Sequence, residues 1–211
     1  MKFSHFKDQI SLLKTKPLGG LASQFKLVPD LRIKISEEKI KNSNPRKAAI
    51  MALFYPNEQN KTTFLLTQRA SYNGTHSAQI SFPGGKYDQG DHNIRQTALR
   101  ELEEEVGVYR NSVKVIRQLS DTYIPPSNFM VTPFLGFLNE KPSLTPNKEV
   151  AKLIEIEAAA LLNDENISSI IMETSYMKGI EVPCFKFHDH IVWGATAMML
   201  SEIKDLMKEI E

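Results

Sequence analysis

Residues 84–108 read GGKYDQGDHNIRQTALRELEEEVGV, which is the most informative pattern in the chain. Two glycines open it, and a helical pattern follows from about His92 to Val106. Successive helical residues turn by about 100°, so an apolar stripe and a group of carboxylates fall on neighbouring sides of this helix. The stripe is Ala98, Leu99, Leu102 and Val106, and the carboxylates are Glu101, Glu104 and Glu105. We therefore expect the helix to pack on a sheet while its adjoining edge presents three carboxylates.

These carboxylates do not favour the helix itself. Like charges four residues apart cost roughly 0.2–0.5 kcal/mol, and acidic residues in the last turns oppose the helix dipole. Arg100 is placed to pair with Glu104, and Gly107 is placed to end the helix in a left-handed conformation. A solvated acidic face is the simpler interpretation. The alternative is a site for a hard divalent cation such as Mg²⁺, approached closely by the Gly84-Gly85 backbone.

The segment resembles the Nudix box: Gly, five residues, Glu, seven residues, then Arg-Glu-apolar-any-Glu-Glu-any-Gly-apolar. Gly85 matches the first glycine, and residues 100–108 match the second half. Asp91 stands where glutamate is usual, and eight residues rather than seven separate it from Arg100. A box lengthened in this way resembles the coenzyme A pyrophosphatase-like branch of the Nudix hydrolases.

Residues 65–85, LLTQRASYNGTHSAQISFPGG, resemble the upstream signature of the same branch. The matching residues are Leu66, Thr67, Arg69, His76, Gln79, Phe82 and Pro83. Ala70, Gly74 and Ala78 depart from the commoner Ser, Arg and Gly, and the missing arginine at 74 removes a basic group that could contact phosphate. Residues 123–133 and 192–197 also resemble this branch, so the resemblance covers about residues 16–200.

The resemblance implies a metal-dependent pyrophosphohydrolase that uses Mg²⁺ or Mn²⁺. The substrate it implies is coenzyme A or its thioesters, cleaved to 4′-phosphopantetheine, or its acyl form, and 3′,5′-adenosine bisphosphate. The implied catalytic residues are Arg100, Glu101, Glu104 and Glu105, with the general base left open among the three glutamates. The implied metal ligands are Glu101, Glu104 and Glu105, with the carbonyl of Gly85.

Because a coenzyme A-like diphosphate is heavily anionic, we expect basic groups around it. Arg69 and Lys86 are the expected substrate-binding cations, Arg95 is a further candidate, and His76 is a candidate substrate contact or a structural histidine. Rival interpretations are hydrolysis of another nucleoside diphosphate derivative, such as a dinucleotide or nucleotide sugar, and a binding module that kept the fold without catalysis. The intact box glutamates argue against the second.

Four other features of the sequence indicate a function less strongly. Glu149 is either an extra base or ligand, or a solvated loop residue, and the second is favoured. A loop is expected from Asp121 to Met130, and the segment from Tyr123 to Pro133 either shapes the substrate mouth or is a rigid turn. Trp193 is expected in the core rather than stacked on an adenine. Cys184 lies in an apolar strand without a partner motif, and we expect no catalytic role for it.

The fold class predicted is α+β: a Nudix fold with a mixed β-sheet sandwiched between α-helices. Residues 1–47 are expected to be an N-terminal extension that begins with a short helix and packs on the core, and residues 48–211 a Nudix hydrolase domain. The expected strands are 48–55, 62–67, 79–82, 113–119, 131–138, 152–156, 167–172 and 182–187. Besides residues 92–106, helices are expected at about 158–163 and 195–210.

Composition limits the remaining choices. The 211 residues carry 26 Lys and Arg against 25 Asp and Glu, a net charge of +1, which argues against a strongly basic nucleic-acid binder. With one cysteine, the chain forms no internal disulfide. No apolar run spans a membrane and no signal peptide is evident, so we expect a cytoplasmic protein. The expected partner is a small-molecule diphosphate, with neither nucleic acid nor membrane, and a homodimer is left open.

Overall fold

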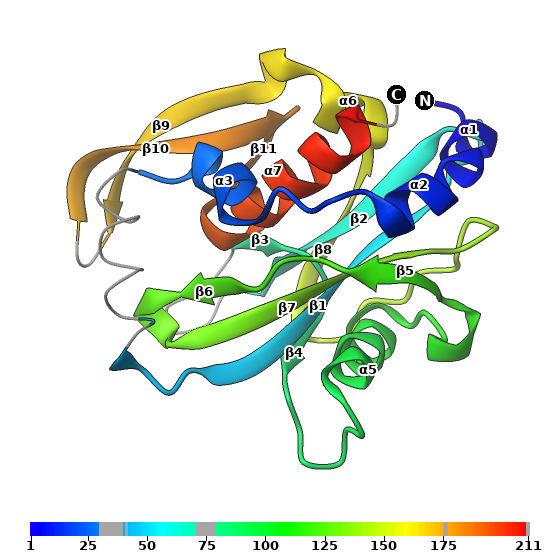
Figure 1. Cartoon of the computed structure of the whole chain (residues 1–211), viewed down its shortest axis with the longest axis horizontal. Coiled ribbons are helices and arrows are strands. Elements are labelled where there is room, and N and C mark those ends of the chain that lie inside the picture. Colours follow the sequence, from blue (N-terminus) through cyan, green and yellow to red (C-terminus); the bar gives the residue numbers. More distant parts are fainter. Residues whose placement is uncertain (30–39, 41, 71–78, 175–176, 210–211) are drawn as a thin grey trace.

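The computed structural model describes residues 1–29, 40, 42–70, 79–174 and 177–209. Its elements form two β-sheets with flanking helices (Figure 1). The helices are α1 (Phe3–Asp8), α2 (Ile10–Thr15), α3 (Gly20–Gln24), α5 (Ile94–Val106), α6 (Ala158–Leu162) and α7 (Gly194–Lys208). The strands are β1 (Arg46–Pro56), β2 (Thr62–Arg69), β3 (Ile80–Ser81), β4 (Gly84–Lys86), β5 (Lys114–Gln118), β6 (Thr122–Ile124), β7 (Phe129–Phe137), β8 (Val150–Glu157), β9 (Ile167–Thr174), β10 (Met177–Phe187) and β11 (His190–Trp193).

The larger sheet is mixed. Its strand order is β3-β2-β1-β7-β5, with β4 beside β1, β6 beside β7 and β8 beside β2. β1 and β7 run parallel, whereas the other pairs within the described part of this sheet are antiparallel. A mixed sheet flanked by helices confirms the predicted α+β class.

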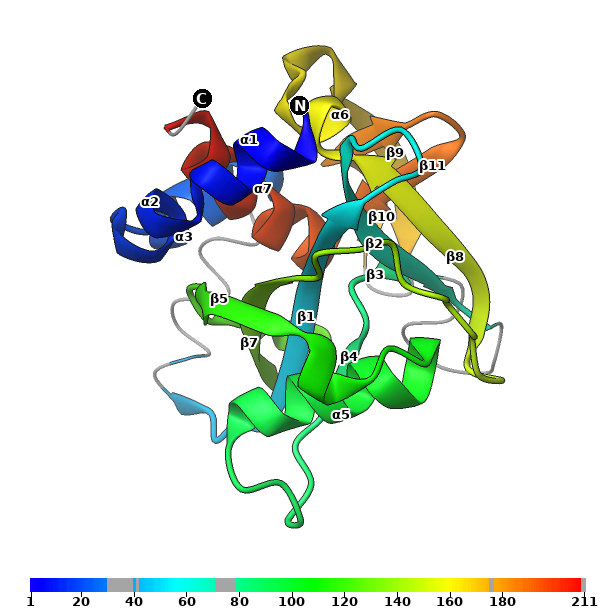
Figure 2. The ribbon, with the colours of Figure 1, turned by 90° about the vertical axis from the view of Figure 1, so that its right-hand side faces the viewer.

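β1 lies between two cores, which explains its continuous apolar sequence. Side chains alternate across a strand, so the run divides between the two faces. Ala48, Ile50, Ala52 and Phe54 share one core with α7, while Ala49, Met51, Leu53 and Tyr55 share the other with α5. Figure 2 shows α5 on one side of β1 and β7, and α7 on the opposite side.

The N-terminal helices cover the α7 side. The ring of Phe6 stacks on that of Phe54 in β1, with centroids 5.3 Å apart. Glu202 of α7 is fully buried and accepts a hydrogen bond from the backbone N–H of Gly20 at 2.9 Å. It also accepts from the hydroxyl of Ser120 at 2.5 Å. This one carboxylate therefore attaches the start of α3 and the segment after β5 to α7.

The smaller sheet has the order β11-β10-β9 and is antiparallel. Phe185 and Phe187 of β10 stack on each other, with centroids 5.4 Å apart, and both belong to the core that α7 shares. Cys184 lies beside them, fully buried. Among the described residues, no helix has the length and apolar character that crossing a membrane requires.

The structure differs from the sequence predictions in short elements. Gly84–Lys86, which follows the strand predicted at residues 79–82, is itself a strand because it pairs with the first half of β1. Part of the predicted loop at residues 121–130 is β6, which pairs with β7. β11 was not predicted, and the single helix expected near the N-terminus is two, α1 and α2. β4 depends on a pairing partner distant in sequence, which no local pattern reveals. β6 and β11 instead form hairpins with the strands next to them in the chain.

Candidate active site

Helix α5 has the start, end and buried side predicted for it. The side chain of Asn93 accepts a hydrogen bond from the N–H of Gln96 and caps the first turn. Gly107 ends the helix with φ 75°, the left-handed conformation that glycine adopts without strain. The apolar stripe is buried, as predicted: Ala98, Leu99, Leu102 and Val106. These contacts fix the direction in which the helix presents its carboxylates.

The carboxylates of α5 meet the backbone of β4. The N–H of Gly84 donates to Glu105 Oε2 at 3.0 Å. Glu101 lies against Gly85 so closely that a Cβ on this glycine would be 2.4 Å from the Glu101 carboxyl carbon. A glycine pair is needed here because any side chain at Gly85 would occupy the place of that carboxylate.

Burial separates the three glutamates into two kinds. Glu105 is only 5% exposed, and burial raises its pKa to about 7, against the opposing effects of the Gly84 N–H and Arg69. Burial also raises the pKa of Glu101, and Glu104 and Glu149 add to the rise. The side chain of Glu104 is 52% exposed. A purely solvated acidic face is therefore excluded for Glu105.

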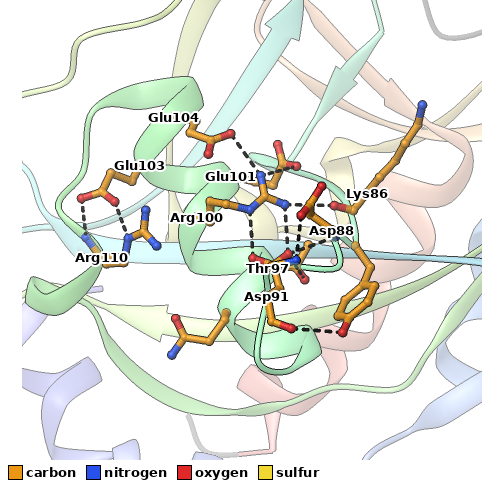
Figure 3. A network of polar contacts seen from close by, with 12 residues as sticks. Lys86, Asp88, Asp91, Thr97, Arg100, Glu101, Glu103, Glu104 and Arg110 are labelled. Carbon is orange, nitrogen blue, oxygen red and sulfur yellow. Dashed lines mark hydrogen bonds and ion pairs between the residues drawn. The ribbon is translucent and has the colours of Figure 1, made fainter.

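Arg100 ties the loop before α5 to these carboxylates (Figure 3). Its Nε and Nη2 donate to the two carboxylate oxygens of Asp91 at 3.0 and 3.1 Å. Its Nη1 donates to Glu101 at 2.9 Å and to Glu104 at 3.1 Å, the second of which confirms the predicted pair. Its Nη2 also reaches the carbonyl of Lys86 at 3.0 Å. The guanidinium thus holds two carboxylates next to the end of β4.

Asp91 is buried and bound on every side. Besides Arg100, it accepts from the hydroxyl of Thr97 at 2.8 Å and from the N–H of Asp88 at 3.1 Å. The Arg100 hydrogen bonds are the main cause that lowers the pKa of Asp91 to about 2. Asp91, which stands where the box usually has glutamate, is therefore held by hydrogen bonds from Asp88, Thr97 and Arg100.

Arg69, at the end of β2, lies near two other carboxylates, those of Glu105 and Glu149. Its Nη1 lies 3.9 Å from Glu105 Oε1 and its Nη2 lies 3.7 Å from Glu149 Oε2. Its Nε is buried and has no hydrogen-bond partner in the described part of the chain. Glu149, half-exposed in its loop, is thus close enough to influence the site, which the sequence alone had not favoured.

A pocket of about 300 Å³ opens over β4. Small residues of β1 and the glycines of β4 line it, together with Arg69 and Lys86. Its other lining residues come from two segments. Ile124, Pro126, Ser127, Phe129 and Val131 come from the β6–β7 hairpin, which the sequence predicted as either part of the substrate mouth or a rigid turn. A second group, at the end of β11 and the start of α7, was not predicted: Trp193, Gly194, Ala195, Thr196 and Met199. A larger cavity, of about 530 Å³ near Glu155 and His188, contains no box residue.

The other predicted site residues have different positions. Arg95 is exposed on α5 and is not part of the pocket lining. His76 lies outside the described residues. Lys86 is exposed, and Figure 3 shows its side chain pointing away from Arg100. Trp193, expected in the core, is instead half-buried on the pocket lining.

Whether these residues suit a divalent cation depends on their charge and spacing. Within the described ranges, no three acidic, histidine or cysteine side chains already stand close enough to enclose a metal. A hard cation such as Mg²⁺ usually takes only one or two carboxylates and completes its shell with water and substrate phosphate. Glu101 raises the pKa of Glu105, and Glu149 raises the pKa of both, so added positive charge would relieve the repulsion among these carboxylates. The Gly85 backbone adjoins Glu101. The donors present fit such an ion.

The NUDIX domain family matches residues 45–173, which is more than half of the chain. The chain belongs to the Nudix hydrolase family. A Photorhabdus laumondii protein named uncharacterized Nudix hydrolase NudL is 35% identical over 146 residues, covering 68% of this chain and 76% of that protein. Nudix hydrolase 15, mitochondrial, of Arabidopsis thaliana is 30% identical over 163 residues, covering 74% of this chain. The match spans 56% of the plant protein, little more than half of its length.

The fold agrees with this membership. The crystal structure of RenU, a Nudix hydrolase from M. smegmatis, superposes with a TM-score of 0.55 at 16% identity, covering 79% of this chain and 88% of that one. The α+β architecture is thus a Nudix fold, as predicted. Nudix hydrolases act on phosphoric anhydrides in nucleoside diphosphate derivatives and generally use divalent metal ions such as Mg²⁺ or Mn²⁺.

Proposed function

We propose that the chain is a metal-dependent pyrophosphohydrolase that cleaves the diphosphate of coenzyme A or its thioesters. The products would be 4′-phosphopantetheine, or its acyl form, and 3′,5′-adenosine bisphosphate. The observation that carries the proposal is the meeting of Glu101 and Glu105 with the Gly84-Gly85 backbone, beside a pocket that Arg69 also lines. The proposal is supported because side chains that would hold a metal lie near a cation that would bind phosphate.

In this proposal Glu101, Glu104 and Glu105 hold the cation, together with the carbonyl of Gly85. When bound, the cation would neutralise the diphosphate and lower the pKa of an attacking water. Arg100 keeps Glu101 and Glu104 in position through its Nη1. The general base is one of the three glutamates.

The basic side chains hold the diphosphate. The N–H at the buried Nε of Arg69 donates to no other described group. A phosphate oxygen would be a suitable acceptor for it. Lys86 extends over the exposed side of the pocket. His76, which lies outside the described residues, remains a candidate contact.

We favour coenzyme A over other diphosphates as the substrate because the lengthened box and the segment at residues 65–85 resemble the coenzyme A pyrophosphatase-like branch. The experiment is a hydrolysis panel of coenzyme A, dephospho-coenzyme A, NADH and ADP-ribose with Mg²⁺ or Mn²⁺, with products separated by chromatography. We expect fastest turnover of coenzyme A, with release of 3′,5′-adenosine bisphosphate. Faster turnover of NADH or ADP-ribose would contradict coenzyme A as the substrate but would still support diphosphate hydrolysis. No turnover of any of these compounds would favour a binding module.

A further inference from the structure

The pocket beside the box has an apolar half for which the diphosphate chemistry has no use. Phe129 and Val131 of β7 line this half, as do Trp193 at the end of β11 and Met199 in α7. A diphosphate and its metal need polar and charged partners, so these side chains must serve the organic group attached to the phosphates.

The sheet register brings this apolar half next to the box. Ala48 of β1 pairs with Lys86 of β4 on one side and with Val131 of β7 on the other. Three strands thus place Lys86, Ala48 and Val131 in one row, and the small Ala48 leaves room above it. A group bound against Val131 and Phe129 is therefore two strands away from the glycines that meet Glu101 and Glu105.

The wall at Phe129 is held in place before any ligand binds. The guanidinium carbon of Arg46 lies 4.1 Å from the centroid of the Phe129 ring, and Arg46 Nη2 donates to the carbonyl of Ser127 at 2.8 Å. Tyr123 donates to Asn128 at 2.9 Å and fixes the same turn. A wall held in this way suits a flat, rigid ligand group better than a flexible chain.

One polar atom in this apolar half also lacks a partner. The hydroxyl of Ser127 is buried without a hydrogen bond among the residues that the structure describes, and Ser127 is part of the pocket lining. A buried hydroxyl is costly unless a ligand or water pairs with it. The ring nitrogens and exocyclic groups of a nucleobase supply such a pairing at the edge of a flat ring.

We propose that Trp193 and Phe129 form a nucleobase site, so that the substrate's nucleoside half, rather than its pantetheine half, lies between the β6–β7 hairpin and the start of α7. This inference rests on the proposed function for the diphosphate, and it adds which end of the substrate the apolar half takes. It replaces the expectation that Trp193 is a core residue.

The test uses the fact that Trp193 is the only tryptophan in the chain, so its fluorescence reports on this pocket alone. The full-length protein, with EDTA present, is titrated with ADP, with 4′-phosphopantetheine and with inorganic pyrophosphate. We expect ADP to quench or shift the emission in a saturable way, and the two ligands without a base to leave it unchanged. A response to 4′-phosphopantetheine and not to ADP would overturn the proposal, as would no response to ADP.

Kinetics provide an independent readout. Trp193→Leu should raise KM for the hydrolysed substrate about 5- to 150-fold, the range for loss of a base–aromatic stack, with little change in kcat. Trp193→Phe keeps a ring and should retain most of the affinity, and Phe129→Leu tests the opposite wall. An unchanged KM in folded Trp193→Leu and Phe129→Leu would overturn the proposal.

Because the fluorescence titration needs no turnover, its result is separate from that of the hydrolysis panel. ADP binding without hydrolysis of any substrate would refute only the proposed function.

Discussion

Arg100 and Asp91 form a two-point ion pair, with Nε 3.0 Å from Oδ1 and Nη2 3.1 Å from Oδ2. The same guanidinium donates to Glu101 and Glu104. Asp91 in turn holds the N–H of Asp88 and the hydroxyl of Thr97. The aspartate and the extra residue of the box therefore make a compact loop that positions the arginine.

Asp91→Asn should destabilise the protein by roughly 1–3 kcal/mol near neutral pH, because it removes the charge from the two-point ion pair and leaves the largely buried Arg100 with Glu101 and Glu104 alone. The pKa of Asp91 is about 2 in the folded protein, below its ordinary value of 3.8. A lowered pKa means that the stabilisation is complete above pH 4 and is lost as pH falls towards 2. Urea unfolding of both proteins from pH 2 to pH 7 should show the difference shrinking in that window. Asp91→Glu, which keeps the charge, should keep a pH-dependent difference from Asp91→Asn; a gap independent of pH would contradict the ion-pair explanation.

The two glycines of β4 should respond differently to alanine. In Gly85→Ala the new Cβ meets the flexible end of Glu101, so the fold should survive while hydrolysis falls at least about tenfold. In Gly84→Ala the Cβ would lie 2.3 Å from the carbonyl oxygen of Ala49 and 2.6 Å from the Cα of Ile50, so the backbone itself must move. Thermal unfolding and activity measured on both variants check this. An inactive Gly85→Ala that is as unstable as Gly84→Ala would mean that the glycine serves folding only.

Arg69→Gln should raise KM about tenfold or more and change kcat less, because Arg69 is proposed to bind the phosphates rather than to take part in the chemistry. Arg95→Gln is the matched control, since Arg95 is an exposed arginine of α5 outside the pocket lining. Steady-state kinetics on coenzyme A separate the two constants. Equal effects of the two substitutions would indicate general electrostatic attraction instead of a contact.

Glu202→Ala should cost about 1–3 kcal/mol, because it leaves the N–H of Gly20 and the groups of Ser120 unpaired in a buried place. Asp205→Ala, on the same helix, removes a more exposed carboxylate that binds Lys26 and the hydroxyl of Ser23, and should cost less than Glu202→Ala. Limited proteolysis should then cut the N-terminal segment faster in Glu202→Ala than in Asp205→Ala. Equal protection in both variants would show that Glu202 holds this segment no more firmly than Asp205 does, against the prediction.

Helix α5 could be predicted from sequence because its information is local. The apolar period, the Arg100–Glu104 spacing and Gly107 all lie within one helix length, and each is found where it was expected. Residues brought in from elsewhere could not be predicted in the same way. Trp193 reaches the pocket because β11 pairs with β10 and leads into α7, and β4 is a strand because β1 offers it an edge. The β4–β1 pairing joins segments distant in the chain, and Trp193 lines one pocket with residues of β4 and β7 that are likewise distant from it in sequence.

The most direct test of the central claim compares two glutamates of the same helix. Glu105 is buried against Gly84, whereas Glu103 pairs with Arg110 away from the glycines. Coenzyme A hydrolysis with Mg²⁺ is measured for wild type, Glu105→Gln and Glu103→Gln, with folding checked by circular dichroism. The account predicts a loss of about 10²–10⁴-fold in Glu105→Gln and near wild-type rates in Glu103→Gln. Wild-type rates in folded Glu105→Gln would contradict it.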